Sequence, residues 1–174
     1  SDDIGEKCKV FFPPINFESI EDYLTPSKKV GSYVLSAGQA NRDYNLLATA
    51  LKNFTSPVTL YCPKNLYTSS VFPPYVIHQE NLDTSGLLSL IRNCRFLVIP
   101  LKDSMELSGL RVLTFGLELG KAIIVTKTEP LTEVFSDDPP FIFCPKENPD
   151  ELTKIMLELD GDEDRIRMIG ERAR

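Results

Sequence analysis

Tryptophan is absent from this chain, histidine occurs once, and no apolar run approaches the ~20 residues that a membrane-spanning helix needs. The lone histidine, His78, follows a short apolar run with no serine or cysteine nucleophile motif beside it, which argues against a Ser-His-Asp hydrolase. The cysteines include no close pair, whereas zinc sites use closely spaced cysteines and histidines, so we expect no bound metal. They are Cys8, Cys62, Cys94 and Cys144.

Positive charge is also scarce. The chain has 19 lysines and arginines against 25 aspartates and glutamates, a formal net charge of −6. This balance argues against binding of nucleic acid, which requires a surface rich in lysine and arginine. The N-terminus is acidic and has neither the basic nor the apolar region of a signal peptide, so we expect a cytoplasmic protein. Binding of a small anionic ligand is still compatible with this net charge if a few cations or helix N-termini point at the ligand.

What the chain does contain is a regular alternation of short apolar runs and longer helical patterns. Its 174 residues favour a single domain, and the alternation is typical of a parallel sheet wrapped by helices. We therefore predict a doubly wound, Rossmann-like α/β fold with helices on both faces of the sheet. The predicted strands are residues 10–12, 33–37, 58–61, 75–78, 96–99, 122–125 and 141–143. The predicted helices are residues 15–24, 42–54, 83–91 (cap residues included), 110–119, 150–159 and 164–174.

Ligands of such sheets bind at the carboxyl ends of the strands, near the point where the strand order reverses. Two loops that follow predicted strands are therefore the candidate site. They are residues 38–43, after the strand 33–37, and residues 100–109, after the strand 96–99.

The first loop has features of an anion site. Gly38 lets a ligand approach the backbone closely, and the helix that follows offers free N–H groups and a partial positive charge. From that helix start, Arg42 can fork onto phosphate oxygens. The alternative is that Asn41 caps the helix and Arg42 is a solvated first-turn residue. The dinucleotide fingerprint is absent, because Ala40 and Asp43 stand where its second and third glycines would fall.

The second loop offers a matching helix start. Ser108 and Gly109 precede the helix 110–119, so the N–H groups there form a second anion site facing the first. Glu106, just upstream, can accept hydrogen bonds from sugar hydroxyls. The alternative makes Ser108 an ordinary N-cap and Glu106 a solvated loop charge.

Taken together and in this order, the segments resemble the C-terminal, donor-binding half of family 4-like glycosyltransferases with the GT-B fold. The matching segments are residues 33–44, 90–101, 108–126 and 148–174. The family places two glutamates eight positions apart; Glu106 matches the first, whereas Thr114 or Phe115 stands at the second, where the ribose-binding carboxylate is expected. Gln39 stands where an arginine commonly contacts phosphate, which leaves Arg42 as the main cation.

The resemblance implies a nucleotide diphosphate sugar as substrate, with no cofactor and no metal. It also implies a partner half, the N-terminal acceptor domain, which is missing from residues 1–174, with residues 1–30 forming an inter-domain segment and the first strand. Transfer is expected to retain anomeric configuration, and the family's commonest roles suggest bacterial surface polysaccharide synthesis. The resemblance implies catalytic roles for Arg42 and Glu106, and donor contacts from Gly38, Gln39, Arg42, His78, Gln79, Asn81, Ser104, Glu106, Leu107, Ser108, Gly109, Leu110 and Thr114.

Within this set, we expect the base over residues 78–81, the phosphates over Gly38, Arg42 and 108–109, and the sugar near Glu106. Two other classes stay open: a non-catalytic regulatory or interaction module with a degenerate donor site, and half of a nucleotide-sugar epimerase. The basic tail, residues 164–174, is expected to pack on the other half of the intact enzyme. Peripheral association of the full-length enzyme with anionic membranes is the alternative.

Overall fold

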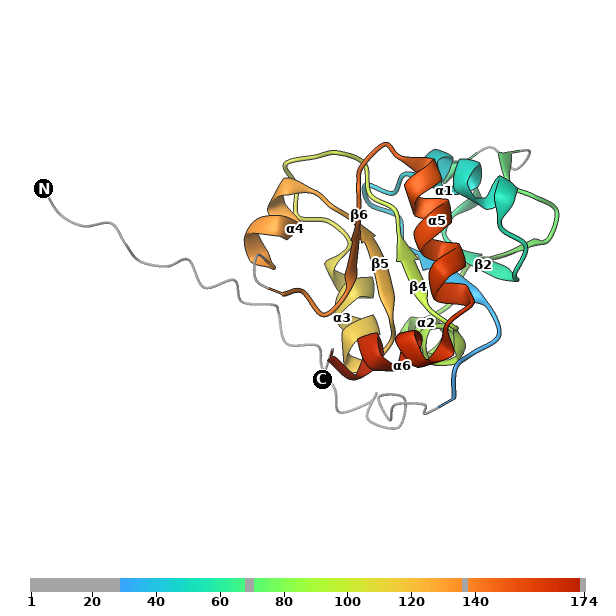
Figure 1. Ribbon diagram of the computed structural model, residues 1–174. Coiled ribbons are helices and arrows are strands. Elements are labelled where there is room, and N and C mark those ends of the chain that lie inside the picture. The colour runs from blue at the N-terminus through green and yellow to red at the C-terminus, as the bar shows by residue number, and fades with distance from the viewer. Residues whose placement is uncertain (1–28, 68–70, 136–137, 173–174) are drawn as a thin grey trace, which may run out of the picture.

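Six parallel strands form one sheet in the computed structural model, which describes residues 29–67, 71–135 and 138–172 (Figure 1). The strand order is β3-β2-β1-β4-β5-β6. The strands are β1 (Val34–Ala37), β2 (Val58–Tyr61), β3 (Val76–Gln79), β4 (Leu97–Ile99), β5 (Ile123–Thr126) and β6 (Ile142–Cys144). The predicted Rossmann-like fold class is thus confirmed. The predicted strand 10–12 and helix 15–24 lie outside the described residues.

The strand order reverses at β1. The chain builds β2 and β3 outward on one side of β1, returns to the other side with β4, and then continues outward through β5 and β6. β1 and β4 are therefore neighbours, with Leu35 opposite Leu97. Helices that follow these two strands lie on opposite faces of the sheet, so their loops diverge and leave room for a ligand between them.

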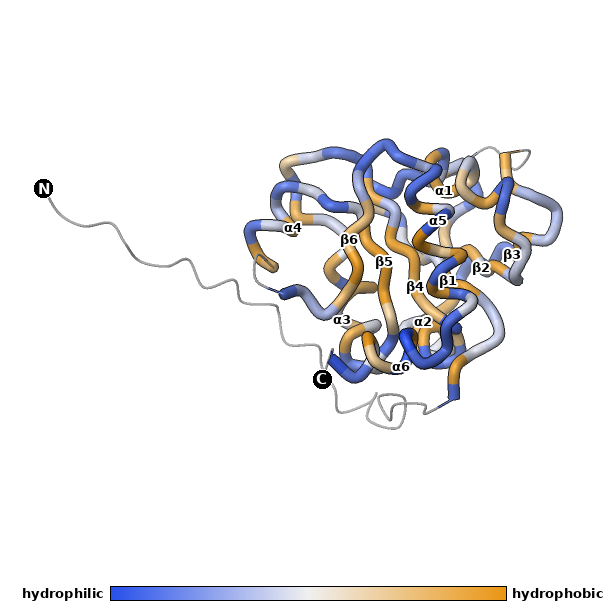
Figure 2. Tube along the Cα trace, viewed as in Figure 1, coloured by the Kyte–Doolittle hydropathy of each residue, from blue (hydrophilic) through white to orange (hydrophobic). Residues whose placement is uncertain are grey.

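The central strands are apolar along their whole length because both faces of the sheet are covered. Every residue of β1 and β5 is buried. Figure 2 shows the hydrophobic colour running through the middle of the sheet, with hydrophilic segments on the outer loops and helices. Successive side chains alternate between faces, so Val34 belongs to one core and Leu35 to the other.

One face is covered by α1 (Tyr44–Ala50), the short 3₁₀ helix η3 (Leu51–Asn53), α5 (Pro149–Asp160) and α6 (Glu163–Arg172). These elements pack their apolar stripes together against the sheet, as Leu47, Met156 and Ile169 illustrate. Figure 1 shows α5 running along this face. The predicted helix 42–54 is in fact the α1–η3 pair, which begins two residues later and tightens in its last turn.

The other face is covered by α2 (Thr84–Asn93), α3 (Leu110–Glu118) and α4 (Glu129–Val134). Their buried side chains include Leu88, Leu113 and Leu131. The sequence prediction missed α4, because six residues are too few to show a helical period. None of the helices in the described part of the chain combines the length and the hydrophobicity that crossing a membrane requires.

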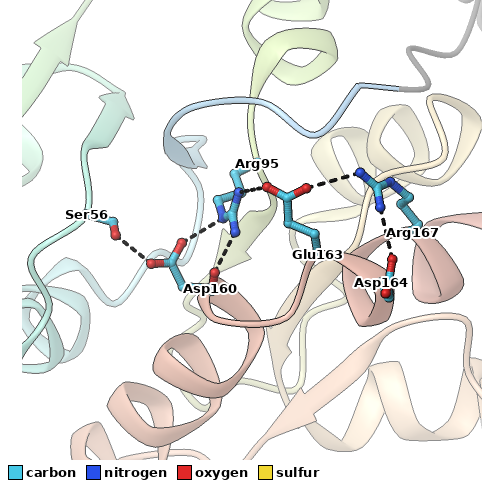
Figure 3. Close-up of polar contacts among 6 residues, drawn as sticks. All are labelled: Ser56, Arg95, Asp160, Glu163, Asp164 and Arg167. Atoms are coloured by element: carbon cyan, nitrogen blue, oxygen red, sulfur yellow. Dashed lines mark hydrogen bonds and ion pairs between the residues drawn. The ribbon is translucent and has the colours of Figure 1, made fainter.

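A chain of ion pairs ties the α5–α6 junction to the segment that enters β4 (Figure 3). Arg95 pairs through Nε with Asp160 Oδ1 at 2.8 Å and through Nη1 with Glu163 Oε1 at 3.1 Å. Its Nη2 donates to the Asp160 carbonyl oxygen. Arg167 continues the chain along α6, at 3.1 Å from Glu163 and 3.0 Å from Asp164. The network fixes α6 at the amino ends of the strands, on the edge of the sheet away from the loops that follow β1 and β4.

Candidate functional site

The loops that follow β1 and β4 are joined to each other at the carboxyl edge of the sheet. Asn41 Nδ2 donates to Ser108 Oγ at 3.1 Å and to Glu106 Oε2 at 3.4 Å. A backbone hydrogen bond joins the same two loops, in which Lys102 N donates to the Asn41 carbonyl oxygen at 2.9 Å. Asp43 N also donates to the Pro100 carbonyl oxygen at 3.0 Å. The two loops that the sequence singled out therefore meet, and Asn41 supplies the side-chain contacts between them.

Beside this junction lies a crevice of about 460 Å³. Its walls come from the loop after β1, the end of β2, the start of α2 and the start of α3. It lies at the reversal of the strand order, where doubly wound sheets bind their ligands. The lining residues are Gly38, Gln39, Ala40, Arg42, Tyr61, Leu82, Asp83, Thr84, Leu87, Gly109, Arg111 and Val112.

Arg42 lies under the floor of this crevice. Its side chain is buried, at 7% exposure, with Nε donating to the Ala37 carbonyl oxygen and Nη1 to the Ala40 carbonyl oxygen, both at 3.0 Å. Burial lowers the pKa of the guanidinium from its usual value. The interpretation of Arg42 as a solvated first-turn residue is therefore wrong. The predicted contact between Arg42 and phosphate stays a prediction, and two of the three guanidinium nitrogens already bind the loop.

Both helix starts differ in detail from the prediction. The N-cap of α1 is Asp43, whose Oδ1 accepts from Leu46 N at 2.9 Å, and not Asn41. Asn41 instead adopts a left-handed backbone with φ of 53°, which frees its amide to reach the second loop. The N-cap of α3 is Gly109, with φ of 84° and no side-chain cap, and not Ser108. The first-turn N–H groups of α3 are thus left without a capping side chain beside the crevice.

The residues between β4 and α3 divide into an outer and an inner set. Glu106 is exposed, and its backbone N–H donates to Ser104 Oγ at 3.0 Å. Leu107 and Leu110 turn inward and pack on the core between the sheet and α3. Thr114, on the next turn of α3, is half-buried and does not line the crevice. Of the predicted residues in this segment, Glu106 is therefore the exposed one, and it does not line the crevice.

The predicted base-binding segment is divided between two places. His78 lies away from the crevice: its Nε2 is 2.6 Å from the Cys62 carbonyl oxygen, and its ring packs against Tyr67 at 5.5 Å. Gln79 ends β3. Asn81, with φ of 58°, lines a cavity of about 260 Å³ that shares Gln39, Tyr61 and Leu82 with the crevice. Of the segment 78–81, Asn81 thus lines the cavity that adjoins the crevice, whereas His78 lines neither.

Two charged residues that sequence reasoning did not assign to the site also line the crevice. Arg111, in the first turn of α3, is exposed and donates from Nη2 to Thr84 Oγ1 at 3.0 Å, with its guanidinium 5.8 Å above the Phe115 ring. Asp83 lies among residues 83–85, which the sequence indicates only as capping residues of a helix. Its hydrogen bonds with Gly86 N and Ser85 Oγ lower the pKa of its carboxyl group. An arginine at the second position of a helix that begins at this loop was the signal available for Arg111.

No group of three or more histidine, cysteine, aspartate or glutamate side chains gathers as a metal site within residues 29–67, 71–135 and 138–172. The cysteines in these ranges, Cys62, Cys94 and Cys144, are buried free thiols. Burial raises the pKa of Cys94 to about 12 and that of Cys144 to about 11. At neutral pH they are therefore small core residues and not thiolate ligands or nucleophiles.

Comparisons with known proteins bear on the fold. No protein-family model and no curated protein matches the sequence. Among solved structures, the C-terminal domain of a glycosyl transferase group 1 family protein (LpcC) from Francisella tularensis has a TM-score of 0.68, at 14% identity over 87% of this chain and 92% of that one. A glycosyltransferase from Rickettsia africae has a TM-score of 0.66, at 14% identity over 89% of this chain and 44% of that one.

A third similar structure is that of HepE from Anabaena in complex with UDP and glucose, with a TM-score of 0.66 at 14% identity over 83% of this chain. The present chain spans 42% of HepE and 44% of the Rickettsia protein, but nearly all of the isolated Francisella domain. It therefore has the fold of the C-terminal domain of GT-B glycosyltransferases.

Proposed function

We propose that this chain is the donor-binding half of a glycosyltransferase and that it holds a nucleotide diphosphate sugar in the crevice between the loops after β1 and β4. The observation that carries the proposal is the position of the crevice: it lies at the reversal of the strand order, and its walls include the uncapped start of α3. A volume of about 460 Å³ falls within the ~300–1,000 Å³ typical of small-molecule sites. The complex of HepE with UDP and glucose supports this choice of ligand class.

The electrostatics of the crevice suit a diphosphate. The first-turn N–H groups of α3 and the guanidinium groups of Arg42 and Arg111 face or underlie it, against one carboxylate, Asp83. Helix N-termini and arginines stabilise anions, and in a partly closed site they act without reorganising. We expect the diphosphate between Gly38 and Gly109, and the base toward Asn81 and Leu82.

Sugar transfer breaks the bond between the anomeric carbon and the leaving phosphate oxygen. The bonding electrons pass to the diphosphate, so negative charge develops there in the transition state. Stabilising that charge lowers the barrier without any protein nucleophile. We propose that the exposed Glu106, at the junction beside the crevice, accepts hydrogen bonds from the sugar hydroxyls. The other half of the enzyme would bind the acceptor, whose oxygen forms the new bond to the anomeric carbon as the diphosphate leaves. Retention of configuration, a cytoplasmic location and surface-polysaccharide synthesis remain proposals that rest on the sequence resemblance.

Calorimetric titration of the chain with UDP, GDP, ADP and their hexose derivatives tests the proposal. We expect one nucleoside diphosphate to bind, with the corresponding nucleoside binding more weakly because it lacks the charged groups. Absence of binding by every one of these compounds at millimolar concentration would contradict the donor site.

A second candidate is a regulatory or interaction module that keeps the fold but not the chemistry. Thr114 favours it, because that position carries no carboxylate for the ribose, and so does Gln39, because it supplies no phosphate-binding cation. If the full-length protein binds a nucleotide sugar but neither transfers the sugar nor slowly hydrolyses the nucleotide sugar, this candidate would be favoured over the enzyme.

A further inference from the structure

We propose that Arg111, and not Arg42, is the arginine that binds the diphosphate of the donor. The proposal rests on the function proposed above and identifies the residue that gives the site its phosphate affinity. The two arginines are the cations among the described residues that line the crevice, and they differ in what their guanidinium groups already bind.

Arg42 is committed to the loop. It holds the carbonyl oxygens of Ala37 and Ala40, and it fills the space beneath Gly38 so tightly that a Cβ there would lie 2.2 Å from Arg42 Nη2. To present a fork of two nitrogens to a phosphate, the side chain would have to release at least one of these carbonyl groups and move out of the space beneath Gly38. Both changes are unfavourable, since buried polar groups need their partners.

Arg111 is free to act on a ligand. It rises from the first turn of α3, so its charge adds to that of the helix N-terminus beside Gly109. One guanidinium nitrogen donates to Thr84 Oγ1, and the guanidinium lies over the face of the Phe115 ring. The side chain is exposed, and within the described residues no further hydrogen bond or ion pair occupies its other nitrogens.

Thr84 is a positioning residue in this arrangement. It is the first residue of α2 and lines the crevice, and its hydroxyl accepts a hydrogen bond from the guanidinium and so holds it in place. A planar fork held in this way can present two parallel N–H groups to phosphate oxygens, which a lysine cannot reproduce. The contact between α2 and α3 thus sets up the cation before a ligand arrives.

The test is calorimetric titration of the whole chain with the nucleoside diphosphate that binds the unmodified protein, and with the matching nucleoside. Arg111→Gln should weaken diphosphate binding ~10- to 100-fold, the loss expected for one hydrogen bond to a charged group. Nucleoside binding should change less than about twofold, because a nucleoside has no phosphate to lose. The diphosphate affinity of Arg111→Lys should lie between those of the unmodified chain and Arg111→Gln, since lysine keeps the positive charge but not the forked pair of N–H groups.

Arg165→Ala is the matched control, because it removes an arginine from α6, which lies on the other face of the sheet and lines no part of the crevice. Its affinity for the diphosphate should equal that of the unmodified chain. Thr84→Val should weaken diphosphate binding ~2- to 5-fold, because the guanidinium of Arg111 loses the exposed hydroxyl that holds it in place, and Thr84→Ser should restore the affinity. Arg111→Gln should leave the melting temperature of the free chain unchanged, whereas Arg42→Gln should lower it.

Unchanged diphosphate affinity in Arg111→Gln would overturn the assignment and leave the donor site itself standing. Equal loss of nucleoside and diphosphate affinity would also overturn it, since Arg111 would then contact the base or the ribose. Failure of the unmodified chain to bind any nucleoside diphosphate would overturn the proposed function, and the assignment of Arg111 with it.

Discussion

The guanidinium of Arg42 occupies the space in which a side chain at position 38 would lie. A Cβ built on Gly38 would come within 2.2 Å of Arg42 Nη2, and the backbone there has φ of 122°, a conformation that residues with a side chain rarely adopt. The glycine that the sequence suggested for the approach of a ligand is therefore required first by the packing of the loop on Arg42. Only the opposite, solvent-facing side of Gly38 is available to a donor.

Gly38→Ala should consequently destabilise the fold in the absence of any ligand. Backbone strain at a positive φ costs about 1–3 kcal/mol, and displacement of Arg42 from Ala37 and Ala40 adds to it. Gly161→Ala is the matched control: its φ is −78° and the nearest atom to its Cβ would lie at 3.5 Å. That substitution should be neutral or stabilise by up to about 1 kcal/mol. Urea unfolding of both variants measures the difference, and equal midpoints would contradict the strain at Gly38.

Asn41 connects the two loops through its side-chain amide, and its backbone adopts a left-handed conformation to do so. Its amide reaches Ser108 and Glu106 from a residue with φ of 53°. Asn41→Gly and Asn41→Ala both remove the amide, but only alanine resists this backbone conformation, so Asn41→Ala should be less stable by about 1 kcal/mol. Both variants should bind a nucleoside diphosphate equally weakly. An affinity that followed stability instead, and differed between the two, would show that the amide contact itself is unimportant.

The ion pairs in Figure 3 are expected to differ in their contributions to stability. Arg95 is the central residue, with 17% of its side chain exposed, and it also binds the Asp160 carbonyl oxygen. We expect Arg95→Ala to lower the free energy of unfolding by about 1–3 kcal/mol, because Asp160 Oδ1 and the Asp160 carbonyl oxygen lose this donor, although Ser56 still donates to Oδ2. Arg167→Ala, at a side chain 48% exposed, should cost less than about 1 kcal/mol, as exposed ion pairs do. Urea unfolding at low and at high salt distinguishes the two, and equal losses would contradict this ranking.

Stability should fall at alkaline pH in part because of Cys144. Burial, assisted by Glu151, raises the pKa of its thiol to about 11, against about 8.5 in an unfolded chain. The unfolded chain therefore loses this proton first, and the contribution of the thiol, complete below about pH 8.5, is lost as the pH rises toward 11. The slope approaches about 1.4 kcal/mol per pH unit.

The comparison that isolates this effect is the free energy of unfolding of the unmodified chain and of Cys144→Ala, measured under reducing conditions from pH 7.5 to 10.5. The variant should be less stable at pH 7.5, where it lacks a buried side chain, and the gap between the two proteins should narrow as the pH rises. A gap that stayed constant would show that the Cys144 thiol titrates alike in the folded and unfolded chains.

The capping residues at the helix ends could be predicted from the sequence only in part. Asp83 was predicted among the N-cap residues of its helix and is the cap of α2, and Gly120 follows α3 with φ of 61°, as a C-terminal glycine should. Asn41 failed as a cap because Asp43, two residues on, took that role. Several polar residues at one loop compete for the same N–H groups, and their order alone does not decide which one wins.

The sequence alone predicts the order along the chain of the strands and of the described α-helices other than α4, their apolar faces, and the two loops that have to meet if the sheet is doubly wound. Those features depend on short-range periodicity and on the covering of both faces of a parallel sheet. The tertiary structure decided what each arginine does. Arg42 turned inward because two carbonyl groups and the empty space beneath Gly38 converge on it, and Arg111 was brought to the crevice by the packing of α3 beside α2. The contact between Arg111 and Thr84 joins residues 27 positions apart, so no local pattern encodes it. The contacts of Arg42 lie within five positions along the chain, but they form only in the folded conformation of the loop.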